Sequence, residues 1–405
     1  MSPALPEADP APDDGALPAT AADGATERAF GVYVHVPFCA VRCGYCDFTT
    51  YTSAELGGGA SQAAYAATAA QEVALAARVL DEAGLPPRPV ATVFFGGGTP
   101  TLLPTSDLAA LLAAVRDTWG LEDGAEVTTE ANPDSVTPAA LAALAGAGFT
   151  RVSFGMQSAV PHVLATLDRT HDPRRIPDVV RWARDAGLAV SLDLIYGTPG
   201  ESLDDWRASV EAALATGVDH VSAYALVVEP GTRMGAQVRR GELARPDDDD
   251  QAAKYELADD LFAAHGLTWY EVSNWARTDA DACRHNLAYW RGEDYLGIGA
   301  SAVSTVDGER RTSPVSVAAY LAGEAPAIEV LSPQTRLWER AMLGLRTAEG
   351  VALAEVAAVL DAGALTRLLG QDCLRRRCGR LRLNPAFLDV SNAVISALLV
   401  TPEGS

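Results

Sequence analysis

The amino-acid sequence predicts an α/β protein: a partial (β/α)6 TIM-like barrel followed by a small, mostly helical, winged-helix-like C-terminal domain. Two observations predict the barrel. From residue 31, short runs of apolar, β-branched or aromatic residues recur along the chain. Stretches with helical spacing of apolar residues separate these runs. Strands that alternate with helices form parallel sheets, and the chemistry of such barrels gathers at the carboxyl ends of the strands.

The strands and the first helices can be placed on the sequence. The helix at 61–84 ends in a glycine, the helix at 106–120 starts with Ser106 as its cap, and the helix at 137–149 has Thr137 as its cap. Six runs are predicted to be the barrel strands: 31–37, 92–98, 126–132, 151–157, 189–197 and 220–226.

Changes in this pattern divide the chain into four parts. The first is rich in Ala, Pro, Asp and Gly, and we expect it to be a disordered tail without the basic and apolar regions of a signal peptide. The second is the barrel core, the third is an extension of the barrel, and the fourth is the C-terminal helical domain. Their boundaries are 1–28, 29–240, 241–333 and 334–405.

The extension is predicted to contain a helix at 251–265 and a strand, TWYEVSNWA, at 268–276. Four aspartates, Asp247 to Asp250, precede the helix. We interpret them as a solvated helix start rather than a metal site. Adjacent carboxylates point in different directions, and Asp suits a helix N-terminus.

The composition excludes several classes of protein. Lys and Arg number 31 and Asp and Glu number 53, so the net charge is −22. This charge argues against nucleic acid as a partner, because proteins that bind the phosphate backbone carry basic stripes. No apolar run reaches the roughly 18 residues of a membrane span. Six cysteines are too few for a disulfide framework, so we expect a cytoplasmic protein.

Three of the six cysteines lie together in VHVPFCAVRCGYCDFTTY, directly after the first predicted strand. Cys39, Cys43 and Cys46 have the spacing C-x3-C-x2-C. Three thiolates on one loop can hold three irons of a [4Fe–4S] cube and leave the fourth iron open. The alternatives are a zinc knuckle, which needs a fourth ligand, or incidental thiols. Cys283, Cys373 and Cys378 lack such spacing, and we interpret them as ordinary residues.

This cysteine spacing after the first strand of a (β/α)6 pattern resembles the radical S-adenosylmethionine (SAM) enzymes, whose open iron binds the amino and carboxylate groups of SAM. Further motifs lie where later strands end: GGGTP at 96–100, TTEANP with Glu130, SFGMQS with Gln157, LDRTHD with Arg169, and SLDLIYGTPGES with Asp193. Taken singly, each of these residues could equally be a core hydrogen-bonding group or a surface charge.

Together the motifs resemble the oxygen-independent coproporphyrinogen III oxidase family, over residues 31 to about 400. The resemblance implies that Cys39, Cys43 and Cys46 are cluster ligands and that Tyr45 is an aromatic residue beside the cluster. It also implies that SAM is contacted by Tyr33, Gly97, Gly98, Thr99, Glu130, Gln157, Arg169, Asp193 and Ala225.

Two features distinguish the branches of this family. True oxidases have a further cysteine two residues after the third, where this chain has Phe48, and HemW-type haem chaperones carry HNxxYW, here HNLAYW at 285–290. Both features resemble the chaperones. The resemblance implies a [4Fe–4S] cluster, SAM and haem as cofactors, with His285 a candidate haem contact. It implies haem-accepting proteins and an electron donor as partners, and leaves open a peripheral association with respiratory enzymes.

Three interpretations therefore follow from the sequence. The first is a haem chaperone of the radical SAM type. The second is an oxidative decarboxylase that converts coproporphyrinogen III to protoporphyrinogen IX. The third is a structural zinc or iron–sulfur protein, which would leave the SAM-contact motifs unexplained. For HNLAYW itself, the alternative to a haem role is that His285 and Asn286 cap local backbone while Tyr289 and Trp290 pack in a core.

Overall fold

The computed structural model describes residues 9–10, 17, 19–55, 62–388 and 390–400. All six predicted barrel strands are present, and they pair in parallel in chain order. They are β2 (Phe30–Val36), β3 (Val90–Gly97), β4 (Leu121–Ala131), β5 (Arg151–Gln157), β6 (Ala189–Tyr196) and β7 (His220–Ala225).

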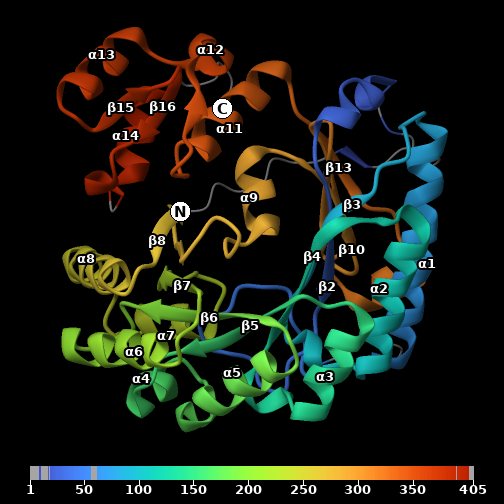
Figure 1. Ribbon diagram of the computed structural model, residues 1–405, viewed down its shortest axis with the longest axis horizontal. Coiled ribbons are helices and arrows are strands. Elements are labelled where there is room, and N and C mark those ends of the chain that lie inside the picture. The colour runs from blue at the N-terminus through green and yellow to red at the C-terminus, as the bar shows by residue number, and fades with distance from the viewer. Residues whose placement is uncertain (1–8, 11–16, 18, 56–61, 389, 401–405) are drawn as a thin grey trace.

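Helices cover the outer face of this sheet (Figure 1). They are α1 (Gln62–Glu82), α2 (Thr105–Trp119), α3 (Pro138–Ala147), α4 (Pro161–Thr166), α5 (Ile176–Asp185) and α6 (Leu203–Ala215). The predicted cap of α3 is confirmed, because Thr137 Oγ1 accepts the N–H of Ala140 at 3.2 Å. The predicted cap of α2 is wrong: the helix begins one residue earlier, after Pro104. The extended backbone of that proline leads into the first turn, and Ser106 lies inside the helix.

The two faces of each strand have different roles, because successive side chains of a strand point to opposite sides. On β3, Val93 and Phe95 are buried in the apolar core. Thr92 and Phe94 point the other way, toward the inside of the barrel, where both contact the ring of His285. The inner face of the sheet is therefore free to carry polar and aromatic groups.

The extension supplies strands to both edges of the barrel. The predicted strand at 268–276 is a hairpin of β8 (Thr268–Glu271) and β9 (Asn274–Ala276), because the chain reverses between these two strands, and β9 pairs with β7. At the other edge, β10 (Asp294–Ile298) pairs in parallel with β2. Helix α9 (Arg284–Arg291) joins the two edges. The sheet continues through β11 (Val303–Val306), β12 (Glu309–Thr312) and β13 (Ala327–Val330), with α10 (Val317–Ala322) between them.

The segment before the barrel corrects one expectation. Residues 1–8, 11–16 and 18 of the predicted disordered tail lie outside the described residues, but residues 19–28 fold onto the barrel. Ala21 and Ala25 are buried, Arg88 donates to the carbonyl of Ala25 at 2.8 Å, and Arg28 pairs with Asp294 at 3.0 Å. The small alanine side chains pack in the hydrophobic core although they show no hydrophobic periodicity, so this part of the tail is ordered.

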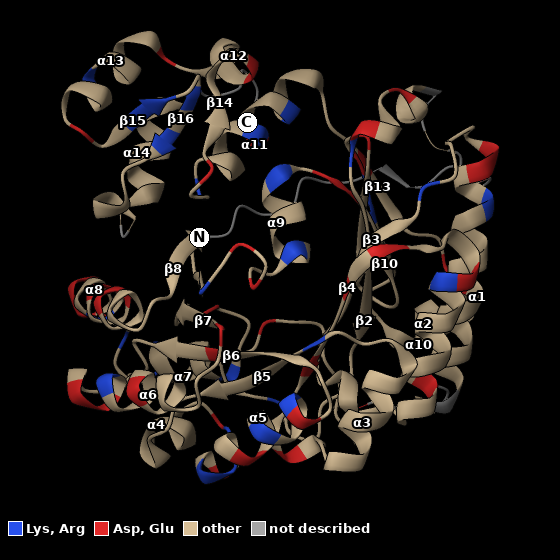
Figure 2. Ribbon diagram, viewed as in Figure 1, with Lys and Arg blue, Asp and Glu red and all other residues tan. Residues whose placement is uncertain are grey.

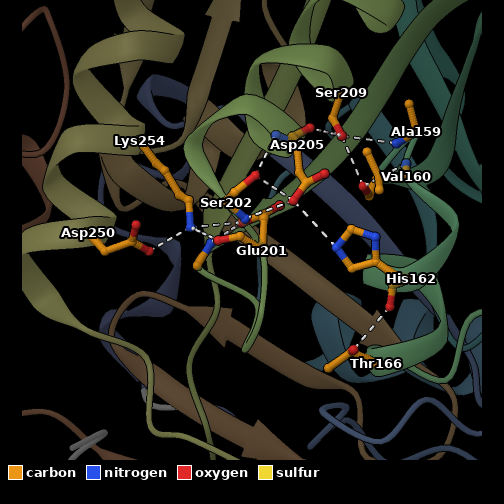
Figure 3. A network of polar contacts seen from close by, with 12 residues as sticks. Ala159, Val160, His162, Thr166, Glu201, Ser202, Asp205, Ser209, Asp250 and Lys254 are labelled. Atoms are coloured by element: carbon orange, nitrogen blue, oxygen red, sulfur yellow. Dashed lines mark hydrogen bonds and ion pairs between the residues drawn. The ribbon is translucent and has the colours of Figure 1, made fainter.

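Helix α8 (Asp248–Ala264) confirms the interpretation of the four aspartates. Asp247 is its N-cap and accepts the N–H of Asp250 at 2.9 Å. Lys254 attaches the helix to the loop after β6. The Nζ of Lys254 lies 3.4 Å from the carboxylate of Glu201 in that loop and 2.6 Å from the carboxylate of Asp250 in the helix itself (Figure 3). The side chains of Lys254 and Glu201 are both fully buried.

The C-terminal part is mostly helical, as predicted. It contains α11 (Pro333–Gly344), α12 (Leu353–Val356), α13 (Ala362–Gly370) and α14 (Ser391–Leu398), with a small sheet of β14 (Val351–Ala352), β16 (Arg380–Leu383) and β15 (Leu374–Arg377). Figure 2 shows basic residues gathered on β15 and β16, so the acidic protein has a locally basic hairpin. The domain boundaries themselves stay a prediction.

Among the described helices, not one combines the length and the apolar character needed to cross a bilayer.

Candidate functional site

A cavity of about 740 Å³ runs from the loops that follow the parallel strands down into the barrel lumen. Every residue predicted to bind the cluster, SAM or haem lines this one cavity, although the residues are spread over about 250 positions of the chain. They are Tyr33, Cys39, Cys43, Tyr45, Cys46, Gly97, Gly98, Thr99, Glu130, Gln157, Arg169, Asp193, Ala225 and His285.

The three cysteines lie on a loop that is fastened at several points. Cys39 N–H donates to the carbonyl of Tyr51 at 3.0 Å, and the carbonyl of Gly44 accepts the N–H of Met234 at 2.8 Å. Gly44 also packs against the carboxylate of Asp168, so closely that a Cβ at Gly44 would collide with an oxygen of Asp168. Met234 belongs to α7 (Arg233–Arg239), so a helix far along the chain holds the middle of the loop.

The three thiols are spaced so that each could bind a different iron of a [4Fe–4S] cluster. Cys39, Cys43 and Cys46 are all half-buried. Across the described part of the chain, no three His, Cys, Asp or Glu side chains converge on one point as ligands of a single ion. A [4Fe–4S] cube does not need such convergence, because each thiolate binds a different iron. The loop thus offers three separate sulfur ligands.

The protonation state of two of these thiols depends on their burial. Burial is the main reason that the pKa of Cys39 is raised to about 11, and the neighbouring Cys46 and Cys43 also contribute. Burial likewise raises the pKa of Cys46. Cys39 and Cys46 therefore resist ionisation in the metal-free protein, whereas a bound metal would replace their protons and stabilise the thiolates.

The glycine turn after β3 packs tightly against the first strand and its loop. A Cβ on Gly98 would lie 2.6 Å from the carbonyl oxygen of Phe38, and a Cβ on Gly97, whose φ is 108°, would lie 2.5 Å from the ring of His35. The N–H of Thr99 donates to the same Phe38 carbonyl at 2.7 Å. Close backbone approach therefore requires these glycines and holds the turn beside the cysteine loop.

Two carboxyl groups face the lumen below this turn. Glu130 accepts the N–H of Gly97 at 3.1 Å, and burial together with the nearby Asp193 raises the pKa of Glu130 to about 8. The oxygens of Asp193 lie 2.8 and 2.9 Å from the hydroxyl of Ser153. Burial also raises the pKa of Asp193. A cationic amine or ribose hydroxyls would be suitable partners for such carboxyl groups.

Arg169 brings a positive charge to the cluster loop. Its Nη1 lies 3.7 Å from the sulfur of Cys43, and its Nη2 donates to the carbonyl of Gly155 at 2.7 Å and to Asn132 at 3.2 Å. The guanidinium is thus oriented toward the cysteines by protein oxygens.

Gln157, where β5 ends, has a left-handed φ of 59° at a shift in the β5–β6 register.

HNLAYW begins at the first residues of α9, which lies over the other end of the lumen. His285 is fully buried, with Nδ1 2.8 Å from Thr92 Oγ1 and Nε2 2.9 Å from the hydroxyl of Tyr289. Thr92 precedes Gly97 by five residues on β3, so His285 lies about 16 Å along the strands from the glycine turn. Both ring nitrogens have partners, and coordination of iron by His285 would displace one of them. Burial lowers the pKa of His285 to about 3.

Several lining residues were missed by the sequence reasoning. Ser153, Ser191 and Ser222 line the lumen, and their signal was the two-residue alternation along β5, β6 and β7. This alternation indicates that the three serines face the lumen, but it does not indicate what their hydroxyl groups do there. Asn392, on α14, also lines the cavity, and its amide oxygen accepts from Arg346 at 2.7 Å. No local pattern in the sequence connects a C-terminal helix with the barrel.

The comparisons with known proteins agree with this geometry. The radical SAM superfamily matches residues 33–213. "Heme chaperone HemW" of Mycobacterium tuberculosis is 47% identical over 379 residues, which cover 92% of this chain and 95% of that protein. "Heme chaperone HemW" of Bacillus subtilis is 33% identical over 329 residues, 79% of this chain and 84% of that protein. The Escherichia coli radical SAM enzyme coproporphyrinogen III oxidase (HemN) has a solved structure with a TM-score of 0.77 and 19% identity. The structural match covers 94% of this chain and 92% of the Escherichia coli chain, which shows that the two share a fold.

Proposed function

The chain belongs to the HemW family of the radical SAM superfamily, and we propose on this basis that it is a haem chaperone. It binds a [4Fe–4S] cluster, SAM and haem, and it delivers haem to acceptor proteins. The observation that carries the proposal is the convergence of all the residues named for these cofactors on one cavity. We place the protein in the cytoplasm, with a separate electron donor for the cluster.

In this proposal Cys39, Cys43 and Cys46 hold the cluster, with Tyr45 beside it. When bound, such a cluster offers its fourth iron to the amino and carboxylate groups of SAM. Arg169 stands next to Cys43 and supplies a guanidinium for the SAM carboxylate. Glu130 and Asp193 accept hydrogen bonds from the amine or the ribose. The remaining SAM contacts are Tyr33, Gly97, Gly98, Thr99, Gln157 and Ala225.

For haem, we propose that HNLAYW provides a wall rather than a free ligand. The ring of His285 lies 5.2 Å from that of Phe94 with an interplanar angle of 20°, and Tyr289 contacts the His285 ring edge-on at 5.0 Å. Aromatic faces of this kind suit an apolar macrocycle. His285 keeps its two hydrogen bonds in the absence of haem, so an axial role would require Tyr289 or Thr92 to release it.

The oxidase alternative is weaker at one residue. Phe48 stands where oxidases of this family have a further cysteine, and its side chain is 58% exposed at the cavity wall. The likeness to the Escherichia coli oxidase, at 19% identity, concerns the fold alone.

One experiment tests the chaperone against the oxidase. Protein reconstituted anaerobically with iron and sulfide is titrated with haem, and a parallel sample with SAM and a reductant is given coproporphyrinogen III. We expect saturable haem binding, near one haem per chain, and no protoporphyrinogen IX. Carbon dioxide release with formation of the divinyl product would overturn the chaperone in favour of the oxidase.

A further inference from the structure

The lower lumen contains polar groups to which the proposed cofactor roles give no partner. Arg151 on β5, Thr128 on β4 and His220 on β7 line the cavity, with exposed fractions of 4%, 1% and 3%. Within the chain as described, Arg151 Nη2, Thr128 Oγ1 and His220 Nδ1 have no hydrogen-bond partner. Buried polar groups are almost always hydrogen-bonded, so three such groups around one cavity indicate a ligand.

All three groups can donate. The guanidinium of Arg151 carries only donors, and a threonine hydroxyl rotates freely. For His220, Nε2 lies 2.8 Å from the hydroxyl of Tyr270, which also accepts the N–H of Cys283 at 3.1 Å, so Nδ1 is the ring nitrogen without a partner. Burial lowers the pKa of His220 well below its ordinary value, so the ring is neutral, and Nδ1 donates in the tautomer in which Tyr270 donates to Nε2. The lumen therefore offers the donors of Arg151 and Thr128 to a ligand, together with His220 Nδ1 in this tautomer.

The carboxylate of Glu126, which lies beside Arg151, is already engaged. Glu126 accepts the N–H groups of Arg284 and His285, each at 3.1 Å, and lies 3.9 Å from Arg151 Nη1. That Nη1 also donates to the carbonyl of Asp281 at 2.7 Å. Nη2 of the guanidinium has no such partner among the described residues. A ligand that satisfies it must bring its own acceptor, and a carboxylate is the acceptor that a guanidinium binds best.

The opposite wall of the lumen is aromatic. Tyr33 on β2 and Phe94 on β3 have ring centroids 6.3 Å apart and nearly parallel planes, and α9 adds His285 and Tyr289. All four side chains line the same cavity as Arg151 and His220. A ligand that fits between the two walls is flat and apolar on one side and bears a carboxylate on the other.

We propose that Arg151, His220 and Thr128 form a carboxylate subsite in the floor of the lumen, and that this subsite takes a propionate arm of haem. The macrocycle then lies along the aromatic wall of Tyr33, Phe94 and Tyr289. This inference rests on the proposed haem-binding function and names the groups that recognise haem without iron coordination. The carboxylate of SAM has the same chemistry, but Arg169, beside the cysteine loop, is the guanidinium assigned to it.

The test compares the affinities of two proteins for two ligands in all four combinations. Reconstituted wild-type protein and Arg151→Gln are each titrated with haem and with haem dimethyl ester, which lacks free carboxylates. We expect the wild type to prefer haem by roughly 10- to 100-fold, the range for a hydrogen-bonded charge pair. We expect the preference to disappear in Arg151→Gln. Arg88→Gln is the matched control, because Arg88 is a buried arginine outside the cavity, and it should keep the full preference.

The other outcomes distinguish a failure of the carboxylate subsite from a failure of the haem-chaperone function. Equal affinity of the wild type for haem and its diester, or a preference that survives in Arg151→Gln, would overturn the subsite. So would an Arg151→Gln protein that loses SAM affinity while its haem affinity is unchanged, because the carboxylate would then be that of SAM. A wild type that binds neither porphyrin overturns the haem chaperone itself. Thr128→Val, which removes only a hydroxyl, should reduce the preference in a protein whose circular dichroism matches the wild type.

Discussion

Glu126, on barrel strand β4, accepts the backbone N–H of His285 at 3.1 Å and so joins the barrel wall to the start of HNLAYW. The same carboxylate accepts the N–H of Arg284 at 3.1 Å. Cys283, the residue before the helix, makes no cap bond with its side chain. A residue about 160 positions earlier in the chain therefore caps α9 and sets the place of the motif over the lumen.

The first prediction concerns this cap. Glu126→Ala is expected to lower the free energy of unfolding by about 1–2 kcal/mol, because two helix N–H groups lose their acceptor. Glu126→Gln should cost less, since its amide oxygen still accepts. Urea denaturation measures both. Glu122→Ala is the control, as Glu122 is exposed and only pairs with Arg284 at 3.6 Å. Equal losses in Glu126→Ala and Glu122→Ala would contradict the capping role.

The second prediction concerns the cluster ligands. Replacing Cys39, Cys43 and Cys46 together by Ala should abolish iron and sulfide binding and the visible absorption of thiolate-bound iron after anaerobic reconstitution. The triple variant of Cys283, Cys373 and Cys378 is the matched control and should keep both, because none of these thiols is on the loop that carries Cys39, Cys43 and Cys46. Iron content per chain decides the result, and retained cluster absorption in the first variant rejects the assignment.

The third prediction concerns the buried contact between Lys254 and Glu201 (Figure 3). Lys254→Met leaves the carboxylate of Glu201 buried without its cation, and breaking such a pair costs about 3–5 kcal/mol. The double variant Lys254→Met with Glu201→Gln should recover a large part of this loss, since no unpaired charge remains. Unfolding free energies of the two single variants and the double variant form the measurement. Strictly additive losses would show that the two residues do not interact.

The fourth prediction concerns acid stability. Burial lowers the pKa of His285 from 6.5 to about 3 in the folded protein. Between these pH values the unfolded chain binds a proton that the folded chain does not, so His285 makes the protein less stable as the pH falls from 6.5 toward 3. His285→Gln should reduce the slope of unfolding free energy against pH in this window by up to about 1.4 kcal/mol per pH unit. The exposed His162→Gln serves as the control, and an unchanged slope in His285→Gln would refute the burial argument.

The order of strands and helices followed from local features of the sequence. The two-residue alternation of GVYVHVP and the cap at Thr137 depend on a few neighbouring residues, so they can be recognised without the fold. Where the local signal was ambiguous, the prediction was wrong. The single strand expected at 268–276 is a hairpin, and alanines 21 and 25 pack against the barrel although their segment has the composition of a disordered tail.

The sequence by itself determined which residues stand at the ends of the barrel strands, because those positions follow from the strand pattern and the motifs. Only the tertiary structure decided what these residues meet. It placed His285 between Thr92 and Tyr289, fastened the cysteine loop to α7, and left Arg151, Thr128 and His220 lining the lumen, each with one polar atom that has no partner. Contacts between residues more than a hundred positions apart are set by how the whole sheet closes and packs, and no local pattern records that closure.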